Sequence, residues 1–302
     1  MKTIVGITGT TSVGKSEVAV NLAKLMGSEI ISADSMQIYK GMNVGTAKIT
    51  AEQMQGVTHY MLDIVEPNCN YSSFLYQQDA AKIIDSLQCV PIVVGGTGFY
   101  FDSLLYPPEF GSVSESRRKE LQQILQNDGI QSLQNLLKQL DADTFDKIDV
   151  NNPKRVLRAI EIAESGAKMA HGVGKTVPNY NLVLFVLQRD RDKLYAQIDR
   201  RVDKMFEEGL VEEVRALTQK YGFVDTPAFA AIGYKEVVEY LKGNCSLEEA
   251  VAQVKINTRH YAKRQITYFK KMNVTEFISV DGESTDAIAE HIHNRLIDMN
   301  IL

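Results

Sequence analysis

One short segment, ITGTTSVGKSEVAVNLAKL at residues 7–25, constrains the fold of this chain more than any other. It matches the pattern G-x-x-x-x-G-K-[ST] through Gly9, Gly14, Lys15 and Ser16. Before it, the β-branched run Thr3–Thr8 predicts a buried strand. After it, apolar residues at Val18, Leu22 and Leu25 recur with the helical period. A glycine loop between a strand and a helix indicates an α/β core that binds a phosphate group.

The glycine loop is expected to hold a polyphosphate, because glycines let backbone N–H groups turn toward an anion and the following helix presents its positive end. Lys15 adds a point charge for the terminal phosphates, and the Ser16 hydroxyl can ligate Mg²⁺. The loop consists of Gly9, Thr10, Thr11, Ser12, Val13, Gly14, Lys15 and Ser16. Such loops are typical of ATP-binding and other nucleotide-binding proteins. The pattern alone does not say whether the polyphosphate is an energy source or a leaving group.

The composition indicates a soluble globular protein. The chain has 302 residues, of which 44% are hydrophobic and 24% charged, which is enough apolar material for a large core. Its net charge of −5 gives no general attraction to nucleic acid, so any such binding needs a local basic patch. The three cysteines, Cys69, Cys89 and Cys245, fit neither a disulfide framework nor a zinc site. Without an apolar window of about 20 residues, we expect a cytoplasmic protein that does not bind a membrane.

Further apolar runs predict a parallel sheet. Glu29–Asp34 and Cys89–Gly98 are expected to be strands, and the segments NYNLVLFVLQRD and VTEFISVDG return to strand character later in the chain. Strands that alternate with helices form parallel sheets, in which ligands bind at the carboxyl ends of the strands. Gly9, Asp34 and Gly95–Gly98 should therefore line one crevice.

The alternation of strands and helices stops near Pro107. A long, glutamine-rich helical stretch begins soon after this residue. We therefore expect an inserted helical domain at residues 107–180, and a core formed by residues 1–106 and 181–302. In the second part of the core, further helices are expected at residues 191–209 with a continuation to 221, at 234–242, at 247–271 and in the closing segment TDAIAEHIHNRLIDM.

Asp34, at the end of the second expected strand, is the candidate general base, because a carboxylate at the mouth of a sheet can take a proton from an attacking O–H or N–H group. In the same segment Gln37 can hydrogen-bond a base edge, and adenine is the natural partner of an amide. The alternative is that Asp34 only caps backbone N–H groups. Thr97 is placed to touch a phosphate or the reacting centre. The aromatic residues after it either wall an apolar tunnel or pack in the core, which is the commoner role: Phe99, Tyr100 and Phe101.

One expected helix near the C-terminus is strongly basic, with six lysines and arginines and no acid between residues 255 and 271. Lys255, Arg259 and Lys263 recur every four residues and so share one helix face. This pattern favours binding of a phosphate backbone, with a solvated helix face as the alternative. Two further groups of cations are Lys154, Arg155 and Arg158 in the insertion, and Arg189, Arg191, Arg200 and Arg201 in the core, one of which can close over the phosphates.

Together these motifs resemble the tRNA dimethylallyltransferases, also called tRNA isopentenyltransferases. The matching segments run from residue 9 to about residue 270: GTTSVGKS, EIISADSMQIYKGMNVGTAK, VGGTGFYFDSLLY, NNPKRVLRAIEI, RRVDKMFEEGLVEEV, AIGYKE and NTRHYAKRQITYF. The resemblance implies a P-loop NTPase-like core, in which helices flank a parallel sheet, with an inserted all-helical domain that contacts tRNA.

The resemblance also implies an enzyme that transfers a dimethylallyl group from dimethylallyl diphosphate to N6 of an adenosine. The implied acceptor is the adenosine on the 3′ side of the anticodon, in tRNAs that read codons starting with U. Diphosphate leaves, and Mg²⁺ assists. The implied partner is the tRNA anticodon stem-loop, and we expect the enzyme to be a monomer.

Carried over residue by residue, the resemblance makes Asp34 the general base, gives Thr97 and Arg201 catalytic roles, and makes the glycine loop the diphosphate site with Ser16 at the metal. The residues expected to contact tRNA, some from the resemblance and some from the charge pattern, are Asp34, Ser35, Met36, Gln37, Lys154, Arg155, Arg158, Lys255, Arg259, Lys263 and Arg264.

Three features depart from the usual family pattern. They are Thr10, Ser12 and Val13 in place of Pro, Ala and Ser in the loop, Gln197 in place of an arginine, and Tyr268 in place of a common Trp. Because the glycines and Lys15 are retained, we expect phosphate binding to persist. Gln197 leaves Arg201, either alone or together with Arg200, as the expected phosphate clamp.

Three other functions are compatible with parts of the sequence. A small-molecule or nucleoside kinase would explain the loop and Asp34, but not the basic helix or the insertion. A non-catalytic RNA-binding protein would leave the glycine loop unexplained. A prenyltransferase that acts on adenylates, as cytokinin-forming relatives do, would need neither the insertion nor the basic helix.

Overall fold

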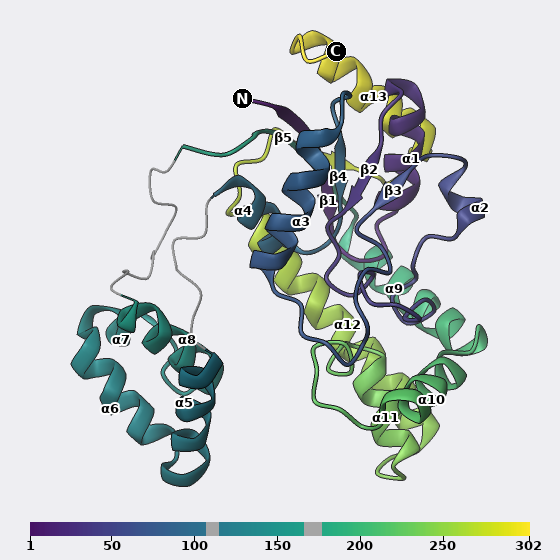
Figure 1. The fold of residues 1–302 in the computed structure, drawn as a ribbon. Helices are drawn as coiled ribbons and strands as arrows, with labels where there is room; N and C mark the ends of the chain where they lie inside the picture. The colour runs from purple at the N-terminus through teal and green to yellow at the C-terminus, as the bar shows by residue number, and fades with distance from the viewer. Residues whose placement is uncertain (107–114, 166–176) are drawn as a thin grey trace. The chain divides into compact units, whose positions relative to one another are not determined.

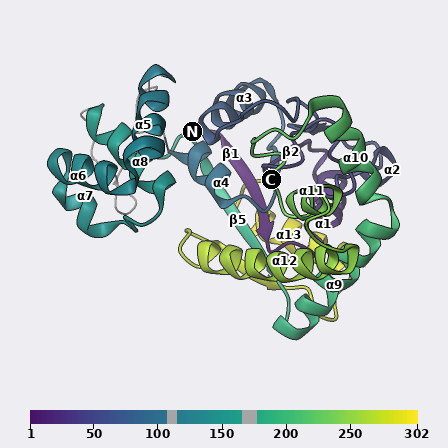
Figure 2. The ribbon, with the colours of Figure 1, turned by 90° about the horizontal axis from the view of Figure 1, so that it is seen from below.

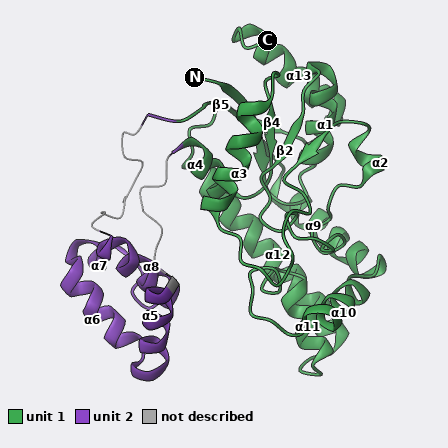
Figure 3. Cartoon of the chain, in the orientation of Figure 1, with its two compact units in different colours: residues 1–105, 179–302 green, residues 106–178 purple. Residues whose placement is uncertain are grey.

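The computed structural model describes residues 1–106, 115–165 and 177–302. The chain divides into two compact units, shown in different colours in Figure 3. Unit 1 contains residues 1–105 and 179–302, and unit 2 contains residues 106–178. The expected boundaries were 107 and 180.

Unit 1 is built on a six-stranded sheet whose strand order is β3-β2-β4-β1-β5-β6, and every neighbouring pair is parallel. The strands are β1 Thr3–Gly9, β2 Ile30–Ser32, β3 His59–Tyr60, β4 Ile92–Val94, β5 Asn181–Gln188 and β6 Glu276–Ser279. This arrangement confirms the parallel sheet and the five strands expected from the sequence. The two-residue strand β3 was not expected, because two residues show no alternation of polar and apolar positions.

Helices cover both faces of the sheet (Figure 1). On one face, α1 (Lys15–Met26) packs with α13 (Thr285–Asp298) over side chains from β1, β4 and β5. On the other face, α3 (Ser73–Ser86) packs with α4 (Gly98–Leu105). Because both faces are covered, β1 and β4 are continuous apolar runs instead of alternating ones.

Four helices gather near the carboxyl ends of the strands (Figure 1). They are α9 Arg191–Glu207, α10 Leu210–Tyr221, α11 Tyr234–Leu241 and α12 Leu247–Phe269. Gly209, with a φ of 97°, separates α9 from α10, where the sequence indicated one helix with a continuation. The long helix α12 crosses this end of unit 1 beside α9 and α11 (Figure 2). A short helix, α2 (Ala51–Met54), lies between β2 and β3 in the sequence.

Unit 2 is helical throughout its described residues, with α5 Glu115–Asp128, α6 Ile130–Leu140, α7 Ala142–Lys147 and α8 Pro153–Glu164. Leucines of α5 and α6 pack with Val156 and Ile160 of α8 in a core of its own. The buried carboxylate of Glu161 in α8 pairs with Arg118 at 2.7 Å and with Arg158 at 3.1 Å. Among the described residues of both units, no helix combines the length and the apolar character needed to cross a membrane.

Candidate active site

The glycine loop joins β1 to α1 and has the backbone of an anion site. Gly9 has a φ of 145°, and a Cβ there would lie only 2.3 Å from the carbonyl oxygen of Leu187, so no larger residue fits. Gly14 has a φ of 97°, which places it in the left-handed region that glycine tolerates. Between them, the side chain of Val13 is buried in the core and anchors the loop.

Lys15, the first residue of α1, lies in a desolvated position in this loop. Its Nζ donates a hydrogen bond to the carbonyl oxygen of Thr10 at 2.7 Å. Burial, and then the positive charge of Arg201, lower the pKa of Lys15 to about 7, against the opposing effect of Asp34. The hydroxyls of Thr10 and Ser12 are buried and have no hydrogen-bond partner among the described residues. The Lys15 ammonium and the Ser12 hydroxyl, which both belong to the lining of the cavity above the loop, suit a bound anion.

A polar cavity of about 500 Å³ opens above the loop. Its lining includes Thr11, Ser12, Gly14, Lys15 and Ser16 from the loop, and Asp34, Gly95, Gly96, Arg201, Tyr261 and Gln265 from elsewhere. The loop after β1, Asp34 after β2 and two glycines after β4, Gly95 and Gly96, therefore line one crevice, as the parallel sheet predicted. Gly9 and Gly98, which were expected there too, do not line it, and neither do Thr10 and Val13.

Asp34 follows β2, and its carboxylate is oriented by its own turn. The Oδ1 atom accepts hydrogen bonds from the N–H groups of Met36 at 2.9 Å and of Gln37 at 3.3 Å. This contact is the capping role that the sequence left as an alternative. It uses Oδ1 only, and no hydrogen bond to Oδ2 is found among the described residues. Asp34 can therefore cap the turn and still face the cavity with its second oxygen.

Thr97 connects the ends of β2 and β4. Its Oγ1 accepts a hydrogen bond from the N–H of Ser35 at 3.1 Å, and its own N–H donates to the carbonyl oxygen of Ala33 at 3.1 Å. Thr97 thus holds the residues on both sides of Asp34. It lines neither this cavity nor the apolar cavity described below.

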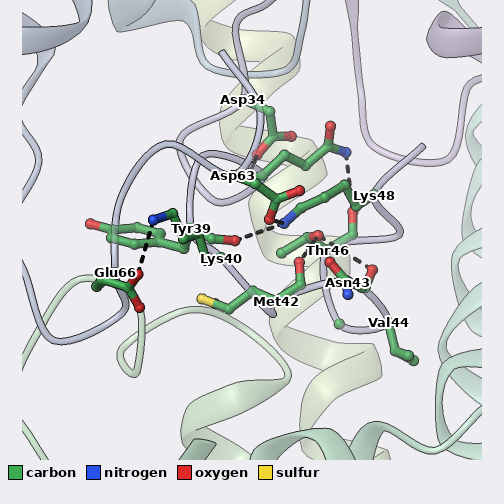
Figure 4. Close-up of polar contacts among 12 residues, drawn as sticks. Asp34, Tyr39, Lys40, Met42, Asn43, Val44, Thr46, Lys48, Asp63 and Glu66 are labelled. Carbon is green, nitrogen blue, oxygen red and sulfur yellow. Dashed lines mark hydrogen bonds and ion pairs between the residues drawn. The ribbon is translucent and has the colours of Figure 1, made fainter. Parts of the chain in front are cut away.

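The loop that follows Asp34 is held by polar contacts (Figure 4). The Nζ of Lys48 points into the loop and donates to the carbonyl oxygen of Tyr39 at 2.7 Å and to Asp63 at 2.6 Å. From α10, the carboxylate of Glu213 accepts hydrogen bonds from three consecutive backbone N–H groups at residues 43–45, at 2.8 to 3.1 Å. These contacts fix the loop that carries Asp34.

Arg201 of α9 is the arginine that reaches the site. It lines the polar cavity and donates to the carbonyl oxygen of Thr46 at 3.2 Å, and burial lowers its pKa. Arg200 is exposed and lines neither cavity, so of the two expected arginines only Arg201 lies at the cavities. Gln197 lines neither cavity either.

An apolar cavity of about 320 Å³ meets the polar one. The two share Thr11, Asp34, Arg201 and Tyr261. The apolar cavity is further lined by Met36, Ile198, Val202, Met205, Pro227, Ile232 and Val254, among others. Asp34 and Arg201 thus lie where an anion site and an apolar site join.

Gln265 of α12 is a site residue that sequence reasoning missed. Its buried side chain accepts a hydrogen bond from the N–H of Thr11 at 2.8 Å and donates to the carbonyl oxygen of Gly96 at 2.9 Å. A Cβ at Gly96 would lie 2.5 Å from Gln265 Nε2, so glycine is required for this contact. Next to it, burial raises the pKa of Tyr261, which stays a neutral hydroxyl. The side-chain amide of Gln265 therefore connects the phosphate loop to the end of β4.

We expect Gln265→Leu to lower both stability and affinity for a phosphate ligand. The substitution removes the partner of the half-buried Thr11 N–H and leaves the buried Gly96 carbonyl with only the Tyr261 hydroxyl, 3.5 Å away, at a total cost of about 1–3 kcal/mol. The free energy of unfolding, measured with urea, should fall accordingly. Gln253→Leu is the matched control, because Gln253 is exposed on the same helix, and it should change stability by no more than about 0.5 kcal/mol. Equal stability of the two variants would contradict the bridging role.

The basic face of α12 is only partly free. Lys255 pairs with Asp203 of α9 at 2.6 Å, and Arg259 forms a two-pronged pair with Asp199 of the same helix. The sequence predicted a shared phosphate-binding face, but acids from α9 already partner two of its three cations. Lys263 and Arg264 are exposed, and Arg264 also lines the apolar cavity. The free positive charge of α12 therefore lies toward its C-terminal half.

The cations predicted in unit 2 lie at the start of α8. Lys154 is exposed, Arg155 lies 3.9 Å from Asp149, and Arg158 pairs with the buried Glu161. Lys154 and Arg155 are thus the more available pair for an external phosphate, while Arg158 helps hold the helices of unit 2 together.

The three aromatic residues after Thr97 do not wall a tunnel. Tyr100 stacks on Tyr76 with ring centroids 3.8 Å apart, and Phe101 is 1% exposed in the same core. Both have the core-packing role that the sequence favoured. Phe99 is exposed and lines neither cavity.

Two family models match the chain. The model described as IPP transferase matches residues 37–272, and the model described as isopentenyl transferase matches residues 2–67. Among curated relatives, a tRNA dimethylallyltransferase of Clostridioides difficile is 43% identical over 295 residues, covering 95% of this chain and 94% of the relative. One of Halalkalibacterium halodurans is 42% identical, covering 96% and 95%.

Solved structures agree with this result. A tRNA isopentenylpyrophosphate transferase of Bacillus halodurans has a TM-score of 0.75 at 39% identity, covering 99% of this chain and 96% of that one. A eukaryotic dimethylallyltransferase acting on tRNA has a TM-score of 0.83 at 26% identity, covering 99% and 80%. The match extends over both units, the phosphate loop and the helices around Asp34. The chain belongs to the IPP transferase family, whose curated members here are tRNA dimethylallyltransferases.

Proposed function

We propose that this protein transfers a dimethylallyl group from dimethylallyl diphosphate to tRNA, at N6 of the adenosine on the 3′ side of the anticodon in tRNAs that read codons starting with U. The observation that supports this proposal most strongly is that the carboxylate of Asp34 lies where a phosphate cavity and an apolar cavity join. A prenyl diphosphate has one polar end and one apolar end, and a general base is needed beside the bond that is exchanged. The named relatives point to the same reaction.

The polar cavity takes the diphosphate. Residues of the loop, among them Lys15 with its ammonium group, line this cavity, and Arg201 lies on its wall. When the allylic carbon–oxygen bond breaks, negative charge grows on the departing diphosphate oxygen. Preorganised donors that meet this charge stabilise the transition state without reorganising. Gln265 keeps the loop in place for this purpose.

The apolar cavity takes the dimethylallyl group. Its methyl-bearing lining, which includes Met36, Val202 and Met205, excludes water from a carbon that gains cationic character as its bond to oxygen stretches. Water excluded from this carbon cannot compete with the acceptor. The cavity exceeds the needs of five carbons, so part of it is available to the acceptor base.

Asp34 prepares the acceptor. The amino group of adenine is a weak nucleophile because its lone pair is delocalised into the ring. Asp34 accepts a hydrogen bond from this N–H and takes the proton as the new carbon–nitrogen bond forms. One carbon–oxygen bond breaks, one carbon–nitrogen bond forms, the proton moves to Asp34, and diphosphate leaves. The adenine must be extruded from the anticodon loop to reach Asp34.

The donor set beside the phosphate cavity suits Mg²⁺. Ser16 offers a hydroxyl at the cavity wall, a hard oxygen ligand of the kind that Mg²⁺ uses together with substrate phosphates and water. Ser16 would hold the ion next to the diphosphate. The ion, when bound, neutralises part of the leaving-group charge.

Cations of both units bind the tRNA backbone in this proposal. Of the cations predicted to contact tRNA, Lys263 and Arg264 in unit 1 and Lys154 in unit 2 form no ion pair with a described residue, and Arg155 in unit 2 lies 3.9 Å from Asp149. Because the described residues of unit 1 line both cavities, one chain suffices for the chemistry, and we expect a monomer that acts in the cytoplasm.

The ion pairs on α12 predict different salt dependences for its cations. Neutralising Lys263 and Arg264 together should reduce the slope of log affinity against log salt by about 0.7–0.9 for each lost phosphate contact. The paired control, Lys255→Gln with Arg259→Gln, should change the slope less, because acids of α9 already neutralise both charges. Filter binding of an anticodon stem-loop at several salt concentrations measures both. An equal change in both variants would show that the α9 ion pairs open on binding.

The proposed function is tested by incubating unmodified tRNA with the protein, Mg²⁺ and dimethylallyl diphosphate, followed by mass spectrometry of the nucleosides. We expect N6-dimethylallyl adenosine from the position next to the anticodon, with one diphosphate released for each product. Transfer of phosphate from labelled ATP to a small acceptor would instead favour the kinase. Stem-loop binding without any product would favour a binding protein.

A further inference from the structure

Phe99 is exposed beside the active site, while its neighbours are buried. It follows the GGTG turn, and 68% of its surface is accessible, compared with 4% for Tyr100 and 1% for Phe101. It is the most exposed phenylalanine among the described residues. The turn before it carries Thr97, which hydrogen-bonds Ser35 beside Asp34. An exposed aromatic ring therefore lies only two residues from a group that positions the general base.

A second ring is held next to Phe99. The ring centroid of Tyr268, on α12, lies 5.2 Å from that of Phe99, with an angle of 51° between the planes. The Tyr268 hydroxyl donates a hydrogen bond to Asp102 of α4. A Cβ at Gly98 would lie 2.3 Å from the Tyr268 ring, so glycine is needed for the ring to pack there. The packing holds Tyr268 in place and leaves Phe99 facing solvent.

The surroundings of this aromatic pair are positively charged. The same turns of α12, and the residues just after it, carry exposed Lys263, Arg264, Lys270 and Lys271. Of these, Lys263, Lys270 and Lys271 form no ion pair with any described residue. Aromatic rings with unpaired cations around them suit a single-stranded nucleic acid, whose bases stack on the rings while its phosphates meet the cations.

We propose that Phe99, supported by Tyr268, is a stacking platform for an RNA base that neighbours the acceptor adenosine. The inference rests on the proposed function, because it takes the anticodon loop as the occupant. Removing the adenosine from the loop unstacks the bases beside it. An exposed ring beside the GGTG turn replaces one of the lost stacking partners and holds the opened loop in place.

The absence of tryptophan from the chain gives a direct test. Phe99→Trp introduces the sole tryptophan, and its emission should be quenched in a saturable way by an unmodified anticodon stem-loop, because a base stacks on the indole. Phe223→Trp is the matched control, since Phe223 is also exposed, at 58%, but lies between α10 and α11 with Lys242 over its ring and is not part of the Phe99–Tyr268 pair. We expect no saturable quenching in that variant.

The energetic contribution of the platform is measured with Phe99→Ala. A lost base-stacking contact should weaken stem-loop binding on the order of 10–100-fold. The loss should appear in KM for RNA more than in kcat, and Phe99→Tyr should restore binding. Phe223→Ala is the control for removing an exposed ring, and an unchanged unfolding midpoint shows that both variants fold.

Wild-type affinity in Phe99→Ala, or absence of quenching in Phe99→Trp while prenylation continues, would overturn the platform and leave the proposed function standing. Failure of the wild-type protein to prenylate tRNA would instead overturn the function. The two failures are therefore distinguishable.

Discussion

Replacing Asp34 with asparagine should lower kcat by about 10²–10⁴-fold, the usual contribution of a general base, with little change in tRNA affinity. Asparagine retains an oxygen that can accept the hydrogen bonds from the N–H groups of Met36 and Gln37, so the turn after β2 should persist. Asparagine cannot take a proton from the adenine amino group. Single-turnover assays at saturating tRNA and donor separate this chemical step from binding.

The comparison with Asp34→Ala separates the two roles of this carboxylate. Alanine loses both the proton acceptor and the cap of the turn, so its stability should be lower than that of the asparagine variant, by about 1 kcal/mol. The chemical defect should be similar in both variants. Near-normal single-turnover rates in Asp34→Asn would mean that Asp34 caps the turn and does not act as the base.

Replacing Lys15 with methionine should lower kcat/KM for dimethylallyl diphosphate by about 10²–10³-fold, as expected when one donor to a developing anion is removed. The ammonium is desolvated and lies in the phosphate cavity, where a charge contributes more than it does in water. Methionine has a similar length and no charge. Steady-state kinetics with varied donor measure the effect, and wild-type kcat/KM would place the diphosphate elsewhere.

The low pKa of Lys15 predicts that donor affinity depends on pH. In the free protein the pKa is lowered to about 7, and a bound diphosphate favours the charged form, so binding raises this pKa. Above about pH 7, binding must therefore take up a proton, and affinity should fall as the pH rises, by at most about tenfold per unit. Below that pH Lys15 is already charged and this dependence disappears.

The pH dependence is best measured between pH 7.5 and 9.5, because phosphate esters complete their ionisation near pH 6. Lys15→Arg is the control, since an arginine stays charged throughout this range. Its donor affinity should vary less with pH than that of the wild type. A flat profile for both proteins would show that Lys15 remains charged in the free enzyme.

Local patterns in the sequence predicted most of the fold. The strand, glycine loop and helix around Gly9–Ser16 are continuous in sequence, so periodicity and the motif suffice to place them. The apolar run that forms β4 predicted both the strand and the glycines that follow it. The separation of α9 from α10 depends on the left-handed conformation of one residue, Gly209, which composition does not reveal.

Contacts between distant segments could not be predicted in the same way. Gln265 lies 254 residues after Thr11 and carries no charge, and nothing within the family segment NTRHYAKRQITYF singles it out, so only the fold shows its bridge to Thr11. Lys255 and Arg259 pair with acids of α9, so their charges are already neutralised. The sequence of α12 alone does not show this, because the partners lie on another helix. Asp34, in contrast, could be identified from the sequence, because it directly follows one expected strand and its place at the end of the sheet does not depend on contacts between distant segments.

In the proposed mechanism, the glycine loop binds the diphosphate and Asp34 binds the adenine where the polar and the apolar cavities join. A crystal structure with an anticodon stem-loop and an unreactive analogue of dimethylallyl diphosphate tests it most directly. We predict the diphosphate on residues 9–16 and the adenine N6 within about 3.2 Å of the Asp34 carboxylate. An adenine N6 remote from Asp34, or a nucleoside triphosphate on the loop with its terminal phosphate directed at an acceptor, would contradict the account.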